Sequence, residues 1–248
     1  MRTQIIIDDN VVPQLLTTAI EAYEFEHQTH SKGRSKIKLE TFGLLWGYSL
    51  PERKNKPAQL VAIMSTVETS ALRHGDWVKP NTKSILMKRE FFCEHWPHLD
   101  LIGTFHSHPY ENLKEVNDNR GWQASAGDKE YWPQFHKDLC PDMDLLAHLV
   151  VTITALSRKG TALPSRLTGG ESTSGYVLTA GERKLWIKGY YTEAVTTHKY
   201  LNDDGQESSG DLDDQNEGVN IAYKTQEKDI LLMIPSVEQR FSHELLRT

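Results

Sequence analysis

The run LLAHLVVTITALS at residues 145–157 constrains the fold more than any other segment. Its length and mostly apolar character are typical of a strand that is covered on both faces. Further strand-like runs lie at 41–50, 59–69, 100–105 and 229–235, helical patterns at 11–27, 81–96 and 125–135, and a hairpin pattern turning near Gly181 at 176–192. Because helices and strands are interleaved, the sequence predicts the α/β (mixed α+β) class, with a central sheet flanked by helices.

The length of 248 residues fits one domain with inserted loops. Apolar residues make up 38% of the chain, which is enough for a hydrophobic core. Residues 202–218 contain seven acidic residues and neither lysine nor arginine, a composition that predicts a flexible loop. We therefore expect a single domain over residues 1–248 that carries an acidic loop in its C-terminal part.

Charge and composition argue against several classes of protein. The net charge of −6 and the absence of a basic run disfavour nucleic-acid binding. No segment approaches the roughly 20 apolar residues of a membrane span, and the opening sequence MRTQIIIDDN does not fit a secretory signal. Two cysteines, Cys93 and Cys140, are too few for a disulfide scaffold or a cysteine-rich zinc finger. The sequence predicts a cytoplasmic protein without membrane or nucleic-acid partners, and it leaves the oligomeric state open.

Two histidines stand at the end of the predicted strand at 100–105, in the sequence His106-Ser-His108-Pro. Because side chains alternate along a strand, both histidines point to the same face. Their Cα atoms would lie roughly 6–7 Å apart, which lets two imidazoles converge on one metal ion. A chain with 11 histidines also gives such a pair by chance, and ordinary surface or core histidines are the simpler interpretation. A catalytic zinc site further requires a third protein ligand.

Two carboxylates are candidates for completing such a site. Asp128 lies in Ser125-Ala-Gly-Asp128, at the start of a predicted helix. This spacing is also a helix-capping signature, and one helix start can serve both purposes. Glu40 precedes the strand at 41–50, where it is either an edge carboxylate or a group that accepts a proton from a zinc-activated water.

Together these segments resemble the JAMM metalloproteases, which are the catalytically active members of the MPN domain family. The family pattern is a glutamate in E-T-x-G-x-L-x-G, then H-S-H-P after a strand, then S-x-x-D. This chain has ETFGLLWG at 40–47, HSHP at 106–109 and SAGD at 125–128. The resemblance covers roughly residues 5–160, which makes 161–248 a C-terminal extension, and it implies an MPN-like sheet.

The resemblance also implies a role for each residue of the motif. His106, His108 and Asp128 would be the zinc ligands, and Glu40 the general base and acid. Ser125 would help to stabilise the oxyanion of the tetrahedral intermediate.

The chain departs from the family pattern in the interval between the second histidine and the aspartate. The family has about eleven residues there, whereas His108 and Asp128 are twenty apart. Asp118 is the alternative third ligand, but Glu115 stands where the motif requires a serine. An insertion within loop 110–124 with Asp128 as the ligand is therefore preferred. Such a loop is expected to contact substrate or to control access to the site.

The function implied by the resemblance is zinc-dependent cleavage of peptide or isopeptide bonds. In this family the substrate is often the C-terminal tail of ubiquitin or of a ubiquitin-like protein, or its conjugate. Two alternatives remain open from the sequence. One is a catalytically inactive MPN scaffold for protein assembly, and the other is a zinc amidohydrolase that acts on a small substrate.

Overall fold

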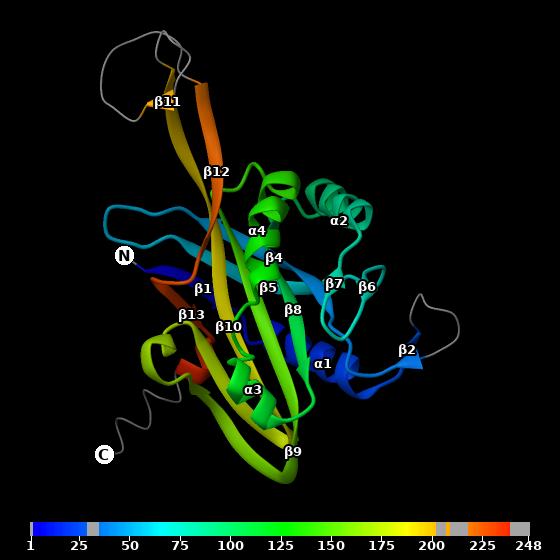
Figure 1. The fold of residues 1–248 in the computed structure, drawn as a ribbon. Helices are drawn as coiled ribbons and strands as arrows, with labels where there is room; N and C mark the ends of the chain where they lie inside the picture. The colour runs from blue at the N-terminus through cyan, green and yellow to red at the C-terminus, as the bar shows by residue number, and fades with distance from the viewer. Residues whose placement is uncertain (1, 29–34, 202–206, 209–217, 239–248) are drawn as a thin grey trace.

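The computed structural model of the chain describes residues 2–28, 35–201, 207–208 and 218–238 (Figure 1). The main strands are β1 (Thr3–Ile7), β4 (Phe42–Leu50), β5 (Gln59–Val67), β8 (Asp100–Tyr110), β9 (Leu145–Arg166), β10 (Gly175–Leu201), β11 (Glu207–Ser208), β12 (Gly218–Gln226) and β13 (Ile230–Met233). They form one sheet in the order β11-β10-β9-β8-β4-β5-β1-β13, and β12 pairs with β10. Both parallel and antiparallel pairs occur, so the predicted mixed α+β class is confirmed.

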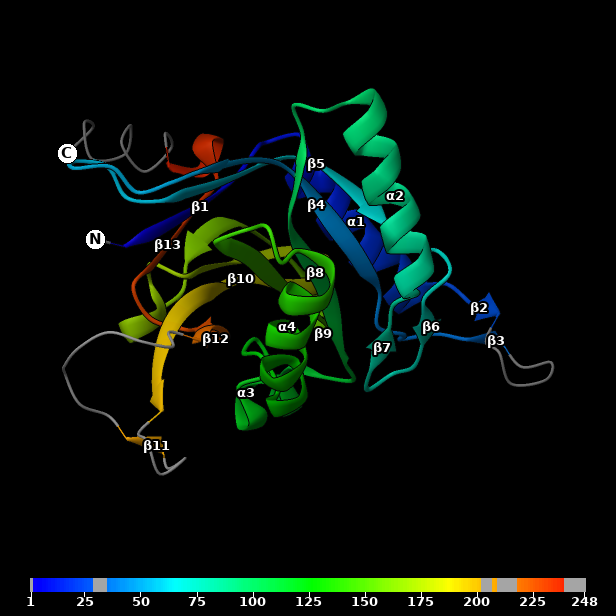
Figure 2. The same ribbon diagram turned by 90° about the horizontal axis from the view of Figure 1, so that it is seen from above.

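Helices cover both faces of this sheet. They are α1 (Val11–Glu24), α2 (Thr82–His95), α3 (Leu113–Asn119), α4 (Ala126–Leu139) and the short 3-10 helix η1 (Gly169–Glu171). Two small ribbons, β2 (His27–Gln28) with β3 (Ser35–Lys36) and β6 (Leu72–Arg73) with β7 (Val78–Lys79), lie outside the main sheet. Figure 2 shows β6 and β7 beyond the end of β4, on the same side of the molecule as α2.

Side-chain alternation along the central strands builds a separate core on each face. Leu45 of β4 and Phe105 of β8 pack with α1, whereas Leu44 and Trp46 of β4 pack with α2 and α4. Each fully buried side chain of this size stabilises the fold by roughly 1.5–3 kcal/mol. Because Phe105 faces α1, the next residue, His106, faces the side of the sheet that α4 covers.

The predicted hairpin at 176–192 was wrong. β10 runs without interruption through Gly181, and its partner in the β9–β10 hairpin is the long strand β9. Gly181 adopts a φ of 66° beside an irregularity in the strand register. A glycine with positive φ fits an irregular strand pair as well as a turn, and in this chain it lies beside a bulge whose extra residues are on β9, between Ala155 and Gly160. The turn of the hairpin lies instead around η1.

Two further expectations need correction. Strand β8 continues through His106, His108 and Pro109 to Tyr110, so the histidines lie within the strand. Residues 110–124, which the sequence predicts as a loop, contain α3, which the Asn112 side chain caps. Only two apolar residues, Leu113 and Val116, lie within α3, so the helical pattern is too short to recognise.

Residues after 160 contribute to the same sheet and core as those before. Tyr176 and Ile187 of β10 and Leu232 of β13 pack in the cluster that contains α1. Most of the acidic stretch, 202–206 and 209–217, lies outside the described residues. Among the helices of the described ranges, none combines the length and apolar character that a membrane crossing requires.

Candidate metal centre

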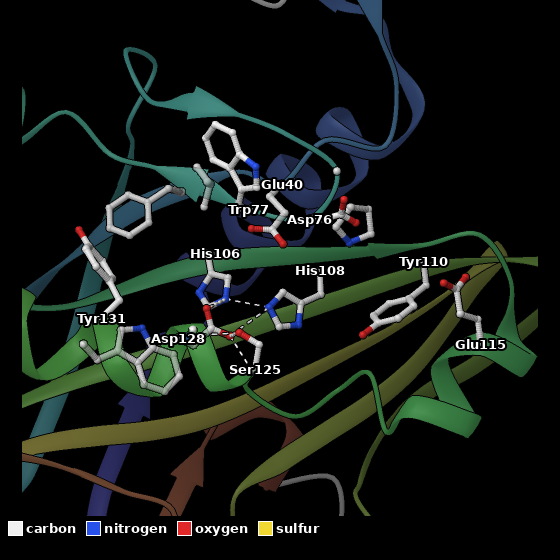
Figure 3. A pocket seen from close by; sticks show the side chains of 16 residues that line it. Glu40, Asp76, Trp77, His106, His108, Tyr110, Glu115, Ser125, Asp128 and Tyr131 are labelled. Carbon is white, nitrogen blue, oxygen red and sulfur yellow. Dashed lines mark hydrogen bonds and ion pairs between the residues drawn. The ribbon is translucent and has the colours of Figure 1, made fainter.

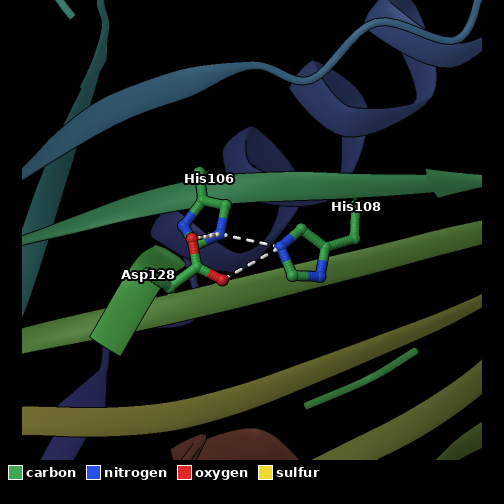
Figure 4. Close-up of side chains that lie close together, drawn as sticks. All are labelled: His106, His108 and Asp128. Atoms are coloured by element: carbon green, nitrogen blue, oxygen red, sulfur yellow. Dashed lines mark hydrogen bonds and ion pairs between the residues drawn. The ribbon is translucent and has the colours of Figure 1, made fainter. Parts of the chain in front are cut away.

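Three candidate ligands meet between β8 and the first turn of α4 (Figure 4). The Nε2 atoms of His106 and His108 lie 3.0 Å apart. Asp128 approaches both rings, with Oδ1 at 3.1 Å from Nε2 of His106 and Oδ2 at 3.3 Å from Nε2 of His108. All the ligand atoms of this group lie within 4.8 Å of one another.

The composition and spacing of this group fit a zinc ion. Zinc bonds to imidazole nitrogen and carboxylate oxygen measure about 2.0–2.2 Å, so tetrahedral ligands stand roughly 3–3.5 Å apart. The observed separations of 3.0, 3.1 and 3.3 Å are close to that requirement, although the two histidines approach different oxygens of the Asp128 carboxylate. Three protein ligands are also the number that catalytic zinc sites use, because the fourth position is left for water or substrate.

Asp128 is held in place by the start of α4. Ser125 caps the helix: its Oγ accepts a hydrogen bond from Asp128 N at 3.1 Å, and Asp128 Oδ2 accepts one from Ser125 N at 2.7 Å. Ser125 Oγ also donates to the same carboxylate oxygen at 2.8 Å. Burial alone would raise the pKa of Asp128, but charge and hydrogen-bond interactions with His106 and His108 hold it well below its usual range. The capping and ligand interpretations of Ser125-x-x-Asp128 are thus compatible in one geometry.

Glu40 reaches the site through the pairing of two strands. Ser107 N donates to Thr41 O at 3.0 Å, which extends the β4–β8 pairing beyond the end of β4. In this register Glu40 stands opposite His108, and both side chains point to the same face. Figure 3 shows the Glu40 carboxylate directed toward the two histidines.

The Glu40 carboxylate is buried and accepts no hydrogen bond from the described residues. Its side chain is only 7% exposed, and its backbone amide donates to His74 O at 2.7 Å, which fixes the start of the strand. Burial raises the pKa of Glu40 to about 8; His108 acts in the opposite direction, and Asp128 and Asp76 add to the rise. Such a carboxyl group is poised to gain or lose a proton near neutral pH.

The orientation of His108 is set by its other ring nitrogen. Nδ1 donates to Gly121 O at 3.4 Å, which leaves Nε2 free to bind a metal. The same carbonyl accepts a hydrogen bond from Thr152 Oγ1 at 2.9 Å, so β9 holds it in place. A Cβ atom at Gly121 would come within 2.5 Å of the Tyr110 ring, so only glycine allows this approach.

A group of side chains beyond the motif holds the loop that carries Gly121. Glu171 of η1 accepts hydrogen bonds from Trp122 Nε1 at 2.8 Å and Gln123 Nε2 at 2.6 Å, and it pairs with the buried Lys188 of β10. We call Glu171, Lys188, Trp122 and Gln123 the loop clamp. The loop clamp is not recognisable from the sequence, because its members are separated by up to 66 positions and carry no characteristic spacing.

Removing the negative charge of Glu171 from the loop clamp should weaken zinc binding. Glu171→Gln leaves Lys188 without its counter-ion and loosens the loop that orients His108. We expect a loss of zinc affinity of about tenfold, at the lower end of the effects known for outer partners of metal ligands. Competition with a chromogenic chelator measures this affinity. Glu182→Gln is the matched control, because Glu182 is exposed and forms an ion pair with Lys159, which is also exposed. Equal zinc affinity in both variants would contradict the assigned role.

Two further histidines, His136 and His148, lie near the site but do not line the cavity. His148 is fully buried, with Nδ1 at 2.8 Å from Thr104 Oγ1 and its ring stacked on Trp132 at a centroid distance of 4.7 Å. His136 shares Thr192 Oγ1 with it. Burial lowers the pKa of His148 well below 6.5, so this ring is neutral and structural.

Acidification should destabilise the fold through His148. In the unfolded chain the His148 imidazole is protonated near pH 6.5, whereas in the folded chain it stays neutral. Unfolding therefore becomes more favourable as the pH falls below 6.5. The effect reaches at most about 1.4 kcal/mol per pH unit. Urea unfolding of the chelator-treated protein at several pH values measures this slope. The slope should be shallower in His148→Gln and unchanged in His98→Gln, whose histidine is exposed. Equal slopes in wild type and His148→Gln would exclude this role.

The structure brings the five residues of the predicted site to one cavity. Glu40, His106, His108, Ser125 and Asp128 all line it. The alternative ligand, Asp118, is exposed and pairs with Lys114 on α3, outside the metal cluster. The roles of these residues in catalysis stay predictions.

Comparison with known proteins gives no family assignment. No protein-family model matches the chain, and no curated protein matches it significantly. The case for a function therefore rests on the chemistry of the site.

Proposed function

We propose that the protein is a zinc-dependent hydrolase of the JAMM type that cleaves peptide or isopeptide bonds in the cytoplasm. The observation that carries this proposal is the convergence of His106, His108 and Asp128, with the unpaired carboxylate of Glu40 beside them in the same cavity. Separate stretches of chain supply these groups, and neither a capping role nor core packing requires all four to meet.

The site supplies the groups that amide hydrolysis requires. His106, His108 and Asp128 would hold the zinc ion. When bound, zinc acts as a Lewis acid and lowers the pKa of water from about 15.7 towards about 7. The Glu40 carboxylate accepts the proton of the attacking water and returns it to the leaving amine. The Ser125 hydroxyl, which donates to Asp128 in the structure, would turn to donate to the oxyanion that forms on the former carbonyl oxygen.

We propose the C-terminal tail of a ubiquitin-like protein, or its conjugate, as the substrate. The sequence resemblance supports this choice, and the cavity of about 430 Å³ is large enough for a few residues of an extended tail. Neither alternative accounts for the site as well. An inactive scaffold has no need of the buried Glu40, and the sequence resemblance that supports a peptide or isopeptide substrate gives no such support to a small amide.

Cleavage assays with matched substrates test the proposal. The zinc-loaded protein is offered linear fusions and isopeptide conjugates of several ubiquitin-like proteins, together with small aryl amides. We expect release of the ubiquitin-like protein, and loss of this activity after treatment with a chelator. Cleavage of the small amides alone would favour the amidohydrolase. A protein that binds no zinc and cleaves none of these substrates would favour the scaffold.

A further inference from the structure

The cavity around the candidate metal centre has one apolar end. Figure 3 shows Trp77, from the segment that joins β6 and β7, and Tyr131 of α4 on the side of His106. Phe42 and Val78 also line the cavity, and Phe42 is paired with His106 across β4 and β8. Trp77 is 49% exposed and Tyr131 is 39% exposed, so both rings keep free surface. Aromatic surface of this kind is where a large apolar side chain gains most on binding.

The other end of the cavity is acidic. Asp76 and Glu115 lie on the side of His108 in Figure 3, and both line the cavity. The Asp76 side chain is 87% exposed. Glu115 uses Oε2 to accept a hydrogen bond from Glu111 N at 3.1 Å, and no hydrogen bond to its Oε1 is found among the described residues.

Acidic side chains outnumber basic ones along the lining of the cavity. Four carboxylates line it, those of Glu40, Asp76, Glu115 and Asp128, and none of the described lining residues is a lysine or an arginine. Glu40 is buried, points into the cavity and lacks a hydrogen-bond partner among the described residues. A divalent ion at the metal centre would balance the charges of Glu40 and Asp128. Asp76 and Glu115 have no lysine or arginine beside them among the described residues of the cavity, and His74, whose Nδ1 lies 3.4 Å from Asp76 Oδ2, uses that nitrogen to accept a hydrogen bond from Asp76 N.

From this division we infer a substrate preference: a large apolar side chain bound between Trp77 and Tyr131 on one side of the cleaved bond, and a cationic side chain facing Asp76 and Glu115 on the other. This inference rests on the proposed hydrolase function and specifies the class of peptide that the site accepts. An acidic segment is excluded from the His108 side by like-charge repulsion. Trp77, Asp76 and Glu115 are thereby specificity-determining residues.

Eight peptides of one length test the inference. They carry phenylalanine or alanine on one side of a central Gly-Gly, and lysine or glutamate on the other, in both orders. Binding to zinc-loaded Glu40→Gln protein is measured by fluorescence anisotropy, and cleavage by the wild type is measured in parallel. We expect the phenylalanine–lysine peptide to bind about tenfold more tightly than peptides that lack either residue.

Variants with matched controls assign each preference to its end of the cavity. Trp77→Ala should remove the preference for phenylalanine and keep the preference for lysine, whereas Trp96→Ala, at an equally exposed tryptophan outside the cavity, should change neither. The double variant Asp76→Asn with Glu115→Gln should remove the preference for lysine, and Asp118→Asn should not.

The outcomes separate this inference from the proposed function. Equal binding of all eight peptides, no binding at millimolar concentration, or preferences that survive the cavity variants would overturn the inference. The expected ranking in binding without cleavage of any substrate would overturn the hydrolase proposal and leave the two-ended binding site in place.

Discussion

Replacing Glu40 with glutamine should lower kcat/KM by about 10²–10⁴-fold, the usual contribution of a general base. Glutamine has nearly the same size, but its amide does not accept the proton of the attacking water. The fold should persist, because no hydrogen bond to the Glu40 carboxylate is found among the described residues. Zinc should remain bound, since its three candidate ligands are unchanged. Glu40→Ala is expected to behave in the same way.

Kinetics, elemental zinc analysis and thermal unfolding on the same preparations separate these effects. Glu111→Gln is the matched control, since Glu111 is exposed and lies outside the lining of the cavity. It should keep full activity. Undiminished hydrolysis by zinc-loaded Glu40→Gln would mean that another group takes the proton. Loss of zinc in this variant would instead make Glu40 part of the binding site.

Replacing His106 with alanine should abolish zinc binding and, with it, activity. The affinity loss should exceed the roughly 10–100-fold effect of mutating outer partners, because one of three direct ligands is removed. Asp128→Ala should have the same effect on zinc and should also destabilise α4. His98→Ala, at an exposed histidine, is the control. Equilibrium dialysis followed by elemental analysis measures the bound zinc.

The capping and ligand roles of Asp128 are separable through Ser125. Ser125→Ala removes the side-chain cap of α4 and should cost about 0.5–2 kcal/mol of stability. Zinc should stay bound, because Asp128 still faces both histidines. Zinc retained by Asp128→Ala but lost from Ser125→Ala would reverse the assignment of these two residues.

The sequence predicted most of the central strands because their apolar character is local. The runs at 41–50, 59–69 and 145–157 correspond to β4, β5 and the first half of β9. The choice of Asp128 over Asp118 was also possible from the sequence, since only Asp128 has a serine three residues before it. That choice placed the carboxylate that the fold brings to the two histidines.

Other features depend on contacts that no local pattern encodes. The bulge beside Gly181 has the composition of a turn, and only its pairing with β9 distinguishes the two. α3 is short, with two apolar residues. The loop clamp joins Trp122 to Glu171 and Lys188, which are brought together by the β9–β10 hairpin. The two ends of the cavity likewise combine side chains from segments far apart in the chain.

The most direct test of the proposed zinc site is the identity and location of a bound metal ion. Crystals of the protein purified with zinc, measured with anomalous scattering at the zinc absorption edge, give both. We expect a single peak bonded to Nε2 of His106, Nε2 of His108 and a carboxylate oxygen of Asp128. Absence of a peak at saturating zinc, or a peak bound by other residues with this cluster empty, would contradict the proposal.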